Sequence, residues 1–271
     1  MTTAHSGGGD ISRSMELLWG LGERPTRGPK PGLTLERIVT AAVSVADAEG
    51  LAALSMRRVA SELGVGTMSL YRYVPGKAEL LDLMLDHVNG EGHPPRPERL
   101  FPADTDWRTV LERTALGMWE LYHRHPWLLQ VDQARPLLGP NATRGVEAVL
   151  AGIEGIGLTQ PEMVAVLVTL DGFVSGVART SVNATTAEQR TGVSNEDFWA
   201  AQVPVLEQVL TSEDYPTLSR ISEEAWRSRG YFEFGLARLL DGLETYLTGE
   251  HGRPRGATDQ AASSPGQVPS D

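Results

Sequence analysis

Hydroxyl, aromatic and cationic side chains gather in one short stretch, GVGTMSLYRYVPGK, which spans residues 64–77 and holds no carboxylate. Hydroxyl and cationic groups can bond phosphate oxygens and base edges, and a methionine side chain can contact a thymine methyl group. A carboxylate there would meet the phosphates at close range and be repelled. These residues, with one arginine just upstream, form a candidate DNA-binding set: Arg57, Thr67, Met68, Ser69, Tyr71, Arg72, Tyr73 and Lys77.

The elements that would hold these side chains are two short helices joined by a tight turn. We expect helices over residues 56–63 and 67–73. Ala60 is small where the second helix must pack on the first, and Gly64 permits a left-handed backbone at the turn. The apolar residues that would brace the pair are Val59, Leu63, Val65, Leu70 and Tyr73. The pattern predicts a DNA-binding helix-turn-helix, and a helical hairpin that only packs is the alternative.

The roles expected within this set differ. Arg57 lies near the start of the first helix, from which it could reach the groove edge and read a guanine. Lys77 and the N–H groups of a helix that begins near Pro75 could hold a phosphate. For Arg58 and Arg72 two roles remain possible from the sequence: contact with a phosphate, or a solvated surface position without a DNA contact.

The charge distribution limits where nucleic acid could bind. The chain of 271 residues has a net charge of −11, but residues 1–80 hold nine Lys/Arg and eight Asp/Glu, so the acid excess lies after residue 80. This balance opposes non-specific binding and a purely architectural DNA-binding protein, but it permits one local contact. The chain has no cysteine, no secretion signal and no apolar run of about 18 residues, so we expect a cytoplasmic protein without a membrane segment.

The rest of the chain indicates an all-α fold, because apolar residues recur at helical spacing and no segment alternates like a strand. A three-helix DNA-binding domain is expected over residues 33–88, and a larger helical ligand-binding and dimerisation domain over 107–250. Gly- and Pro-rich composition predicts a flexible N-terminal arm over 1–32 and a disordered tail over 251–271. The other expected helices are 35–48, capped by Thr34, one from residue 75 onward, 107–124, 126–131, 140–155, 160–184, 195–210 and 223–248.

The stretch RVASELGVGTMSLYRYVPGKAELLDLM, residues 58–84, resembles the DNA-binding domain of the tetracycline-repressor (TetR) family of bacterial regulators. The hallmark positions of that family are matched by Ala60, Leu63, Gly64, Val65, Leu70, Tyr71, Val74, Lys77 and Leu80. The resemblance covers residues 33–90. It implies that Tyr71 and Lys77 contact the DNA backbone and that Arg57 and Thr67 can read bases.

A looser resemblance continues into the second domain. HRHPWLL (123–129), LLGPN (137–141) and FEFGLARLLDGLE (232–244) are similar to the ligand-binding domain of the branch nearest the tetracycline repressors. This implies an all-helical homodimer with a four-helix interface, which we assign to residues 160–184 and 223–248. Gly172 and Gly176 would let helices approach closely there, either between subunits or within one.

The sequence indicates the chemical identity of the ligand less clearly than it indicates DNA binding. Tetracycline repressors bind a drug–magnesium complex through a histidine, but the segment after His125 offers Asp132 instead, so tetracycline is not the expected ligand. Metal ligation by His123, His125 and Asp132 is an alternative to ordinary surface roles, and no metal or cofactor is expected. The aromatic residues that could line a pocket for an apolar or aromatic effector, or form plain core, are Trp119, Tyr122, Trp127, Phe173, Phe198 and Trp199.

Two segments of this chain resemble enzyme motifs, but each match is incomplete. GFVSG at 172–176 has the wrong spacing for a serine nucleophile, and GIEGIG at 152–157 lacks the strand that a dinucleotide site needs. The sequence therefore predicts a non-enzymatic, homodimeric transcriptional repressor that binds double-stranded operator DNA and responds to a small molecule. A helical enzyme that binds small molecules, or an activator without a repressor role, is the alternative.

Overall fold

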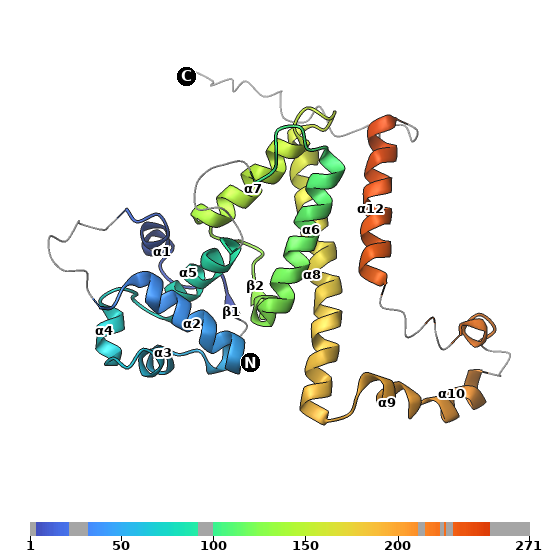
Figure 1. The fold of residues 1–271 in the computed structure, drawn as a ribbon, viewed down its shortest axis with the longest axis horizontal. Helices are drawn as coiled ribbons and strands as arrows, with labels where there is room; N and C mark the ends of the chain where they lie inside the picture. The colour runs from blue at the N-terminus through green and yellow to red at the C-terminus, as the bar shows by residue number, and fades with distance from the viewer. Residues whose placement is uncertain are drawn as a thin grey trace, which may run out of the picture.

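The computed structural model describes residues 4–21, 32–91, 100–210, 215–222, 225 and 230–249. Within these ranges the regular secondary structure is helical apart from two short strands, which confirms the predicted all-α fold. The N-terminal helices lie at one edge of the molecule and α12 at the opposite edge, with α6 and α8 between them (Figure 1). The predicted tail over 251–271 and residues 92–99, between the two domains, lie outside the described residues.

The DNA-binding domain begins with helices whose ends follow from local sequence. Its elements are α2 (Leu35–Glu49), η1 (Leu51–Ala53), α3 (Met56–Glu62), α4 (Thr67–Tyr71) and α5 (Lys77–Asn89). The hydroxyls of Thr34 and Ser55 accept backbone N–H groups three residues later, so both are N-caps. Gly50, which ends α2, has φ +81°, in the left-handed region that glycine adopts without strain. The predicted starts of α2, α3 and α4 are confirmed.

The second domain contains the remaining helices. They are α6 (Trp107–Arg124), η2 (Pro126–Gln130), α7 (Pro140–Ile153), α8 (Gln160–Thr191), α9 (Asn195–Ala200), α10 (Val203–Leu210), η3 (Leu218–Arg220) and α12 (Tyr231–Thr248), with strand β2 (Val131–Asp132) after η2. The predicted helix 195–210 is two helices, α9 and α10. Residues 223–230 of the predicted helix 223–248 lie largely outside the described residues.

The long helix α8 continues to Thr191, beyond the predicted end at residue 184. Threonine hydroxyls in this stretch donate to carbonyls four residues earlier, as Thr186 does to Val182 at 2.8 Å, so these polar side chains are satisfied within the helix. Gly192, with φ +68°, then ends the helix.

The prediction of a flexible N-terminal arm over 1–32 is wrong for residues 4–21, and residues 1–3 and 22–31 of that arm lie outside the described residues. Strand β1 (Ala4–His5) pairs in parallel with β2 of the second domain, and α1 (Ile11–Leu18) packs against α5. The Asp82 carboxylate of α5 accepts hydrogen bonds from the Gly7 backbone N–H at 2.9 Å and the buried Ser14 hydroxyl at 2.8 Å. We name residues 4–21 the N-terminal strap, because they contact both domains.

The strap also reaches the segment before α7. The Trp19 indole N–H donates to the Leu138 carbonyl at 3.1 Å, and the Leu137 N–H donates to the Ser6 hydroxyl at 3.3 Å. Composition could not predict these hydrogen bonds, because single polar groups make them.

The two domains share one hydrophobic core, which runs from α2 and α5 through α6 and α7 to α8 and α12. At the junction, Asp86 of α5 accepts the N–H groups of Asn141 and Ala142 at 3.0 and 2.9 Å, so it caps α7 from another helix. The residue at the N-cap of α7 itself is Gly139, where a Cβ would lie 2.4 Å from the Asp86 carboxylate. Burial raises the pKa of Asp86.

One face of α8 is apolar and uncovered. Its exposed residues recur at helical spacing: Pro161, Val164, Ala165, Val168, Gly172 and Gly176. Among the described helices, α8 alone is long and apolar enough to cross a membrane by length and composition. However, it packs on α6 and α12 and carries Glu162 and Asp171 within the apolar stretch. We therefore interpret the uncovered face as a protein interface and not as a membrane span.

Candidate DNA-binding surface and ligand cavity

The helix-turn-helix geometry depends on small and left-handed residues at the turn. Ala60 is buried, Gly64 has φ +67°, and the Val65 N–H closes the turn by donating to the Ala60 carbonyl at 3.0 Å. Leu70 on α4 and Val74 just after it are fully buried. These anchors fix α4 on α3, so the opposite face of α4 points outward.

That outward face carries the candidate DNA-binding residues and lies at the edge of the molecule away from α12 (Figure 1). Met68 is 75% and Tyr71 44% exposed, and Arg72 is exposed as well. Thr67 and Ser69 are half-buried. The face therefore presents a thioether, a phenol, a guanidinium and two hydroxyl groups.

Three cations of this region have no carboxylate partner among the residues that the structure describes. Arg57 on α3, Arg72 after α4 and Lys77 at the start of α5 are exposed and form no ion pair with any described residue. Lys77 begins a helix whose N-cap, Gly76, offers no side-chain hydrogen bond to the first turn. Positive charge and backbone N–H groups thus occur together at the start of α5.

Arg58, next to Arg57, forms ion pairs with two carboxylates. Its guanidinium contacts Glu49 at 2.6 Å and Glu62 at 2.8 Å, and hydrogen bonds to these carboxylates raise its pKa. Of the two alternatives that the sequence left open for Arg58, the geometry favours a surface role over phosphate contact.

Tyr73, a member of the predicted DNA-binding set, makes its contacts within the domain. Its hydroxyl donates to the Leu33 carbonyl at 2.9 Å, and its ring packs against the core. This residue braces the start of the domain, so we correct its assignment and leave it out of the proposed DNA contacts.

Aromatic residues of the second domain meet where α6, α8 and α12 pack. Trp119 of α6 stacks on Phe232 of α12, with ring centroids 4.4 Å apart, and Phe173 of α8 lies 6.0 Å from Phe232. A Cβ at Gly235 would lie 2.5 Å from the Phe173 ring, so a larger residue here would have to displace that ring. The sequence singled out Trp119 and Phe173 but missed Phe232, although Phe232 begins the apolar stripe of α12.

Tyr122 lies one helical turn after Met118 on α6 and is buried. Its hydroxyl donates to Asp171 of α8 at 3.1 Å, and burial raises the pKa of that hydroxyl. The residue therefore joins α6 to α8 beside the aromatic cluster.

Three predicted pocket residues lie elsewhere, which corrects their assignment as one group with Trp119. Trp127 is 1% exposed, and its indole N–H donates to Asp47 of α2 at 2.8 Å, so it fills the domain junction. Phe198 and Trp199 are about half exposed on α9, which extends from the far end of α8 (Figure 1). Their rings contact each other at 5.5 Å and no other described aromatic ring.

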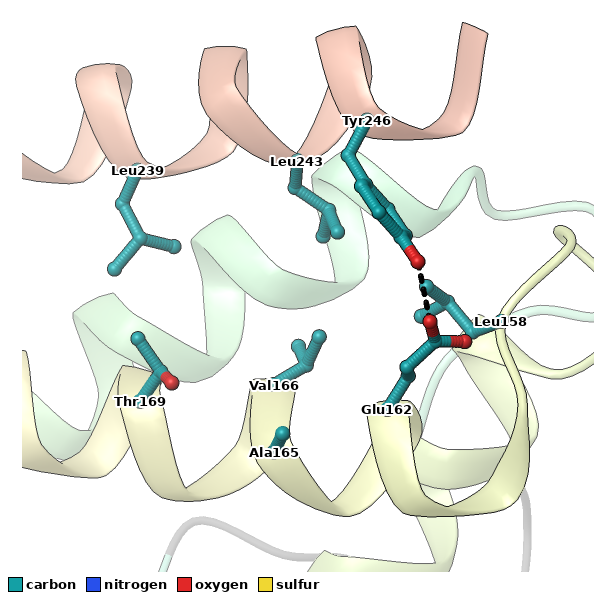
Figure 2. A pocket seen from close by; sticks show the side chains of 8 residues that line it. All are labelled: Leu158, Glu162, Ala165, Val166, Thr169, Leu239, Leu243 and Tyr246. Carbon is teal, nitrogen blue, oxygen red and sulfur yellow. Dashed lines mark hydrogen bonds between the residues drawn. The ribbon is translucent and has the colours of Figure 1, made fainter. Parts of the chain in front are cut away.

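An open cavity of about 280 Å³ lies between α8 and α12 (Figure 2). Its walls are mostly aliphatic, and one end is polar, because the Tyr246 hydroxyl donates to the Glu162 carboxylate there. The residues that line it are Leu158, Glu162, Ala165, Val166, Thr169, Leu239, Leu243 and Tyr246. Phe173 follows Thr169 by one helical turn, so the aromatic cluster adjoins this cavity.

A polar cluster at the domain junction escaped the sequence analysis. The ring nitrogens of buried His125 lie 2.8 Å from Asp47 and 3.0 Å from Glu91, partners 78 and 34 residues away. Ionised carboxylates only accept, so the ring can donate to both only when it carries two protons. Burial raises the pKa of Glu91, but hydrogen bonds from His125 and Arg124 outweigh it and leave this pKa below its usual value.

The alternative of a metal site at His123, His125 and Asp132 gains no support. Within the described residues no group of three such side chains could hold a metal ion. His123 instead bonds the Trp119 carbonyl at 2.8 Å and the Ser181 hydroxyl at 3.0 Å.

Two family models match the chain. The model described as bacterial regulatory proteins, tetR family, matches residues 38–84, and the model described as tetracyclin repressor-like, C-terminal domain, matches residues 101–247. The HTH-type transcriptional repressor DrrR1 of Streptomyces coeruleorubidus is 54% identical over 93% of this chain and 92% of its own length. Tetracycline repressor protein class E of Escherichia coli is 26% identical over 79% of this chain and 92% of its own length.

The structure is also similar to solved structures. The Streptomyces coelicolor TetR family protein ActR in complex with actinorhodin has a TM-score of 0.64 at 31% identity, covering 80% of this chain and 97% of that one. The apo form of ActR has a TM-score of 0.57 at 28% identity, covering 83% of this chain and 100% of that one.

Proposed function

This chain belongs to the tetracycline-repressor family and is a DNA-binding transcriptional regulator, and from this premise we propose that it represses transcription as a homodimer until a small molecule releases it from its operator. The observation that carries the proposal is the surface formed by α4, Arg57 and Lys77. It is exposed, cationic and free of ion pairs with described residues, in a chain whose net charge is −11. Such local positive charge can bind a polyanion, although the acidic remainder of the protein repels it.

In the proposed complex α4 enters the major groove of operator DNA. Arg57 and Thr67 read base edges, and Tyr71 and Lys77 hold the phosphate backbone at either side. The other outward residues of α4, which are Met68, Ser69 and Arg72, complete the contact. Two copies of the helix would reach successive major grooves, roughly 34–36 Å apart or somewhat more.

The proposed dimer uses the uncovered face of α8 together with α12. A Cβ at Gly172 or Gly176 would meet no atom within 4 Å, so packing within the described part of the subunit does not explain these glycines. On α12, Tyr231 is 42% and Phe234 65% exposed. A second copy would cover this apolar surface and bring four helices together, as the resemblance implies.

The proposed effector is an apolar or aromatic molecule that binds between α8 and α12. The aliphatic cavity there and the adjoining cluster of Trp119, Phe173 and Phe232 offer apolar and ring-shaped surface, and the Tyr246–Glu162 pair offers a polar end. ActR, which shares this fold, was crystallised with actinorhodin, and this supports a small organic effector for the present chain.

Release from DNA follows from the way the helices connect. An effector that separates α8 from α12 also shifts α6 and α7, because they share one core with these helices. Asp86 fixes α7 to α5, and Trp127 fixes η2 to α2, so such a shift reaches the helix-turn-helix. The effector must bind the two states with different affinity, and coupling of about 1–3 kcal/mol is typical.

No step of this function needs catalysis, so we infer that the protein is not an enzyme. The effector is then released from the protein without chemical change. The proposed place of action is the cytoplasm, where operator DNA is accessible. The proposal needs no metal or cofactor.

The experiment that tests this function is selection of bound fragments from genomic DNA with the purified protein at physiological salt. We expect one near-palindromic site, and the genes beside it will suggest effectors to test for release. Transcription in vitro from the recovered promoter should fall when the protein is added. A protein that selects no preferred duplex would contradict DNA-specific regulation, and stimulated transcription would favour the activator alternative.

A further inference from the structure

A second cavity lies where η2 meets the C-terminal half of α8. It measures about 280 Å³, close to the lower end of the range for small-molecule sites. Pro126 and Leu129 of η2 and Val182 of α8 form its apolar side. It shares no lining residue with the cavity between α8 and α12, so a ligand here is separate from the proposed effector.

The polar side of this cavity is rich in hydrogen-bond donors and includes no acid, although its amides and the Thr186 hydroxyl can also accept. Arg179 and Arg190 supply two guanidinium groups, and Gln130 and Asn183 supply two amides. Neither arginine is ion-paired with a described residue, and Arg179 makes one hydrogen bond, to the Leu129 carbonyl at 3.3 Å. Two guanidinium groups without a carboxylate create local positive charge in a chain of net charge −11.

We propose that this cavity binds a small organic anion, a carboxylate on a compact apolar or aromatic body. Guanidinium groups match a carboxylate through paired N–H donors, and here two of them face one cavity. The amide of Asn183 adds a further donor, and the side chains of Leu129 and Val182 contact the body of the ligand. A neutral ligand of the same shape would leave the two charges uncompensated.

The place of this cavity connects it to the DNA-binding domain. η2 packs against α2 as well as α8, and Trp127 within η2 donates to Asp47 of α2. An anion held between η2 and α8 therefore contacts a segment of the second domain that packs against α2 of the DNA-binding domain. Occupancy changes operator affinity, and this part of the inference rests on the proposed function.

Benzoate is a suitable probe, with benzyl alcohol as its neutral analogue, and both are titrated into the full-length protein by calorimetry at constant ionic strength. We expect saturable binding of one benzoate per chain and at least about tenfold weaker binding of benzyl alcohol. The variant with Arg179→Gln and Arg190→Gln should bind benzoate at least about tenfold more weakly than the wild type. Arg113→Gln, an exposed arginine of α6 outside the cavity, is the matched control and should leave the affinity unchanged.

Folding of the variants is checked by circular dichroism. If the double variant is unfolded, Arg190→Gln alone decides the matter, because it removes no hydrogen bond within the described chain. Equal benzoate affinity in this variant and the wild type overturns the site, as does equal affinity for benzoate and benzyl alcohol or no saturable binding.

Operator affinity measured with and without saturating benzoate then tests the coupling. A benzoate-dependent change of operator affinity in the wild type that is absent in the double variant supports the coupling. Benzoate binding without a change of operator affinity overturns the coupling, but the proposal of an anion site then still stands. Failure of the ligand-free wild type to select an operator would contradict the proposed function, so the three results are separable.

Discussion

Neighbouring arginines on α3 have different surroundings, which predicts different roles. Arg58 is held by Glu49 and Glu62, whereas Arg57 has no carboxylate partner among the described residues. Contact of Arg58 with a phosphate would first break its two ion pairs with Glu49 and Glu62. Arg57 has no such cost, so its whole interaction with DNA contributes to binding.

Arg57→Ala should weaken binding to the selected operator by about 1–3 kcal/mol and relax the preference at one base pair, because a guanine contact carries sequence information. Fluorescence anisotropy against the operator and single-base variants measures both effects. Arg58→Ala is the control and should keep the base preference. Equal losses for Arg57→Ala on every sequence would mean that Arg57 contacts a phosphate.

Lys77→Ala should lower affinity for all duplexes without changing base preference, since a lysine at the start of α5 interacts with phosphate and not with a base. Each phosphate contact contributes roughly one unit to the slope of log K against log salt concentration. The measurement is this slope for the wild type and the variant between low and physiological salt. An unchanged slope would place Lys77 outside the interface.

The helices differ in how far the sequence could predict them. The starts of α2, α3 and α4 depend on neighbours such as Thr34 and Ser55, so the sequence was sufficient. Contacts between distant residues were missed, because no local pattern reports them. Examples are the cap that Asp86 provides for α7 and the strap held by Asp82. The aromatic residues show the same limit, since spacing shows that Trp127 is buried but does not show against which helix.

The N-terminal strap leads to a prediction at the level of elements. Ser14→Ala removes a buried hydroxyl and leaves one oxygen of Asp82 without its 2.8 Å partner. Loss of one partner of a buried hydrogen bond costs about 1–3 kcal/mol, so the free energy of unfolding should fall by this amount. Urea unfolding at constant protein concentration measures it.

Ser12→Ala is the matched control for this measurement. Ser12 is exposed on the same helix and lies outside the Asp82 network, so its stability should stay within about 0.5 kcal/mol of the wild type. Equal effects of the two substitutions would show that helix propensity, and not the buried hydrogen bond, explains the loss.

The whole molecule has a cationic surface at one edge and an uncovered apolar face on α8, and the proposed function needs both. One helix-turn-helix reads only half of a palindromic operator, so specific affinity depends on two copies at a fixed separation. In the proposed dimer the shared core sets this separation within each subunit, and the α8 face would set it between subunits. Loss of the apolar face should therefore affect DNA binding without any change at α4.

Val168→Glu tests this relation, because Val168 is 66% exposed at the centre of the α8 face and a carboxylate there would be buried without a partner in the dimer. We expect sedimentation as a monomer, an unchanged helical content and much weaker binding to the full operator. Leu116→Glu on α6, 47% exposed in the single chain, is the control and should leave the dimer intact. A Val168→Glu protein that still sediments as a dimer would place the interface on another face, and the release mechanism would then have to act through that face.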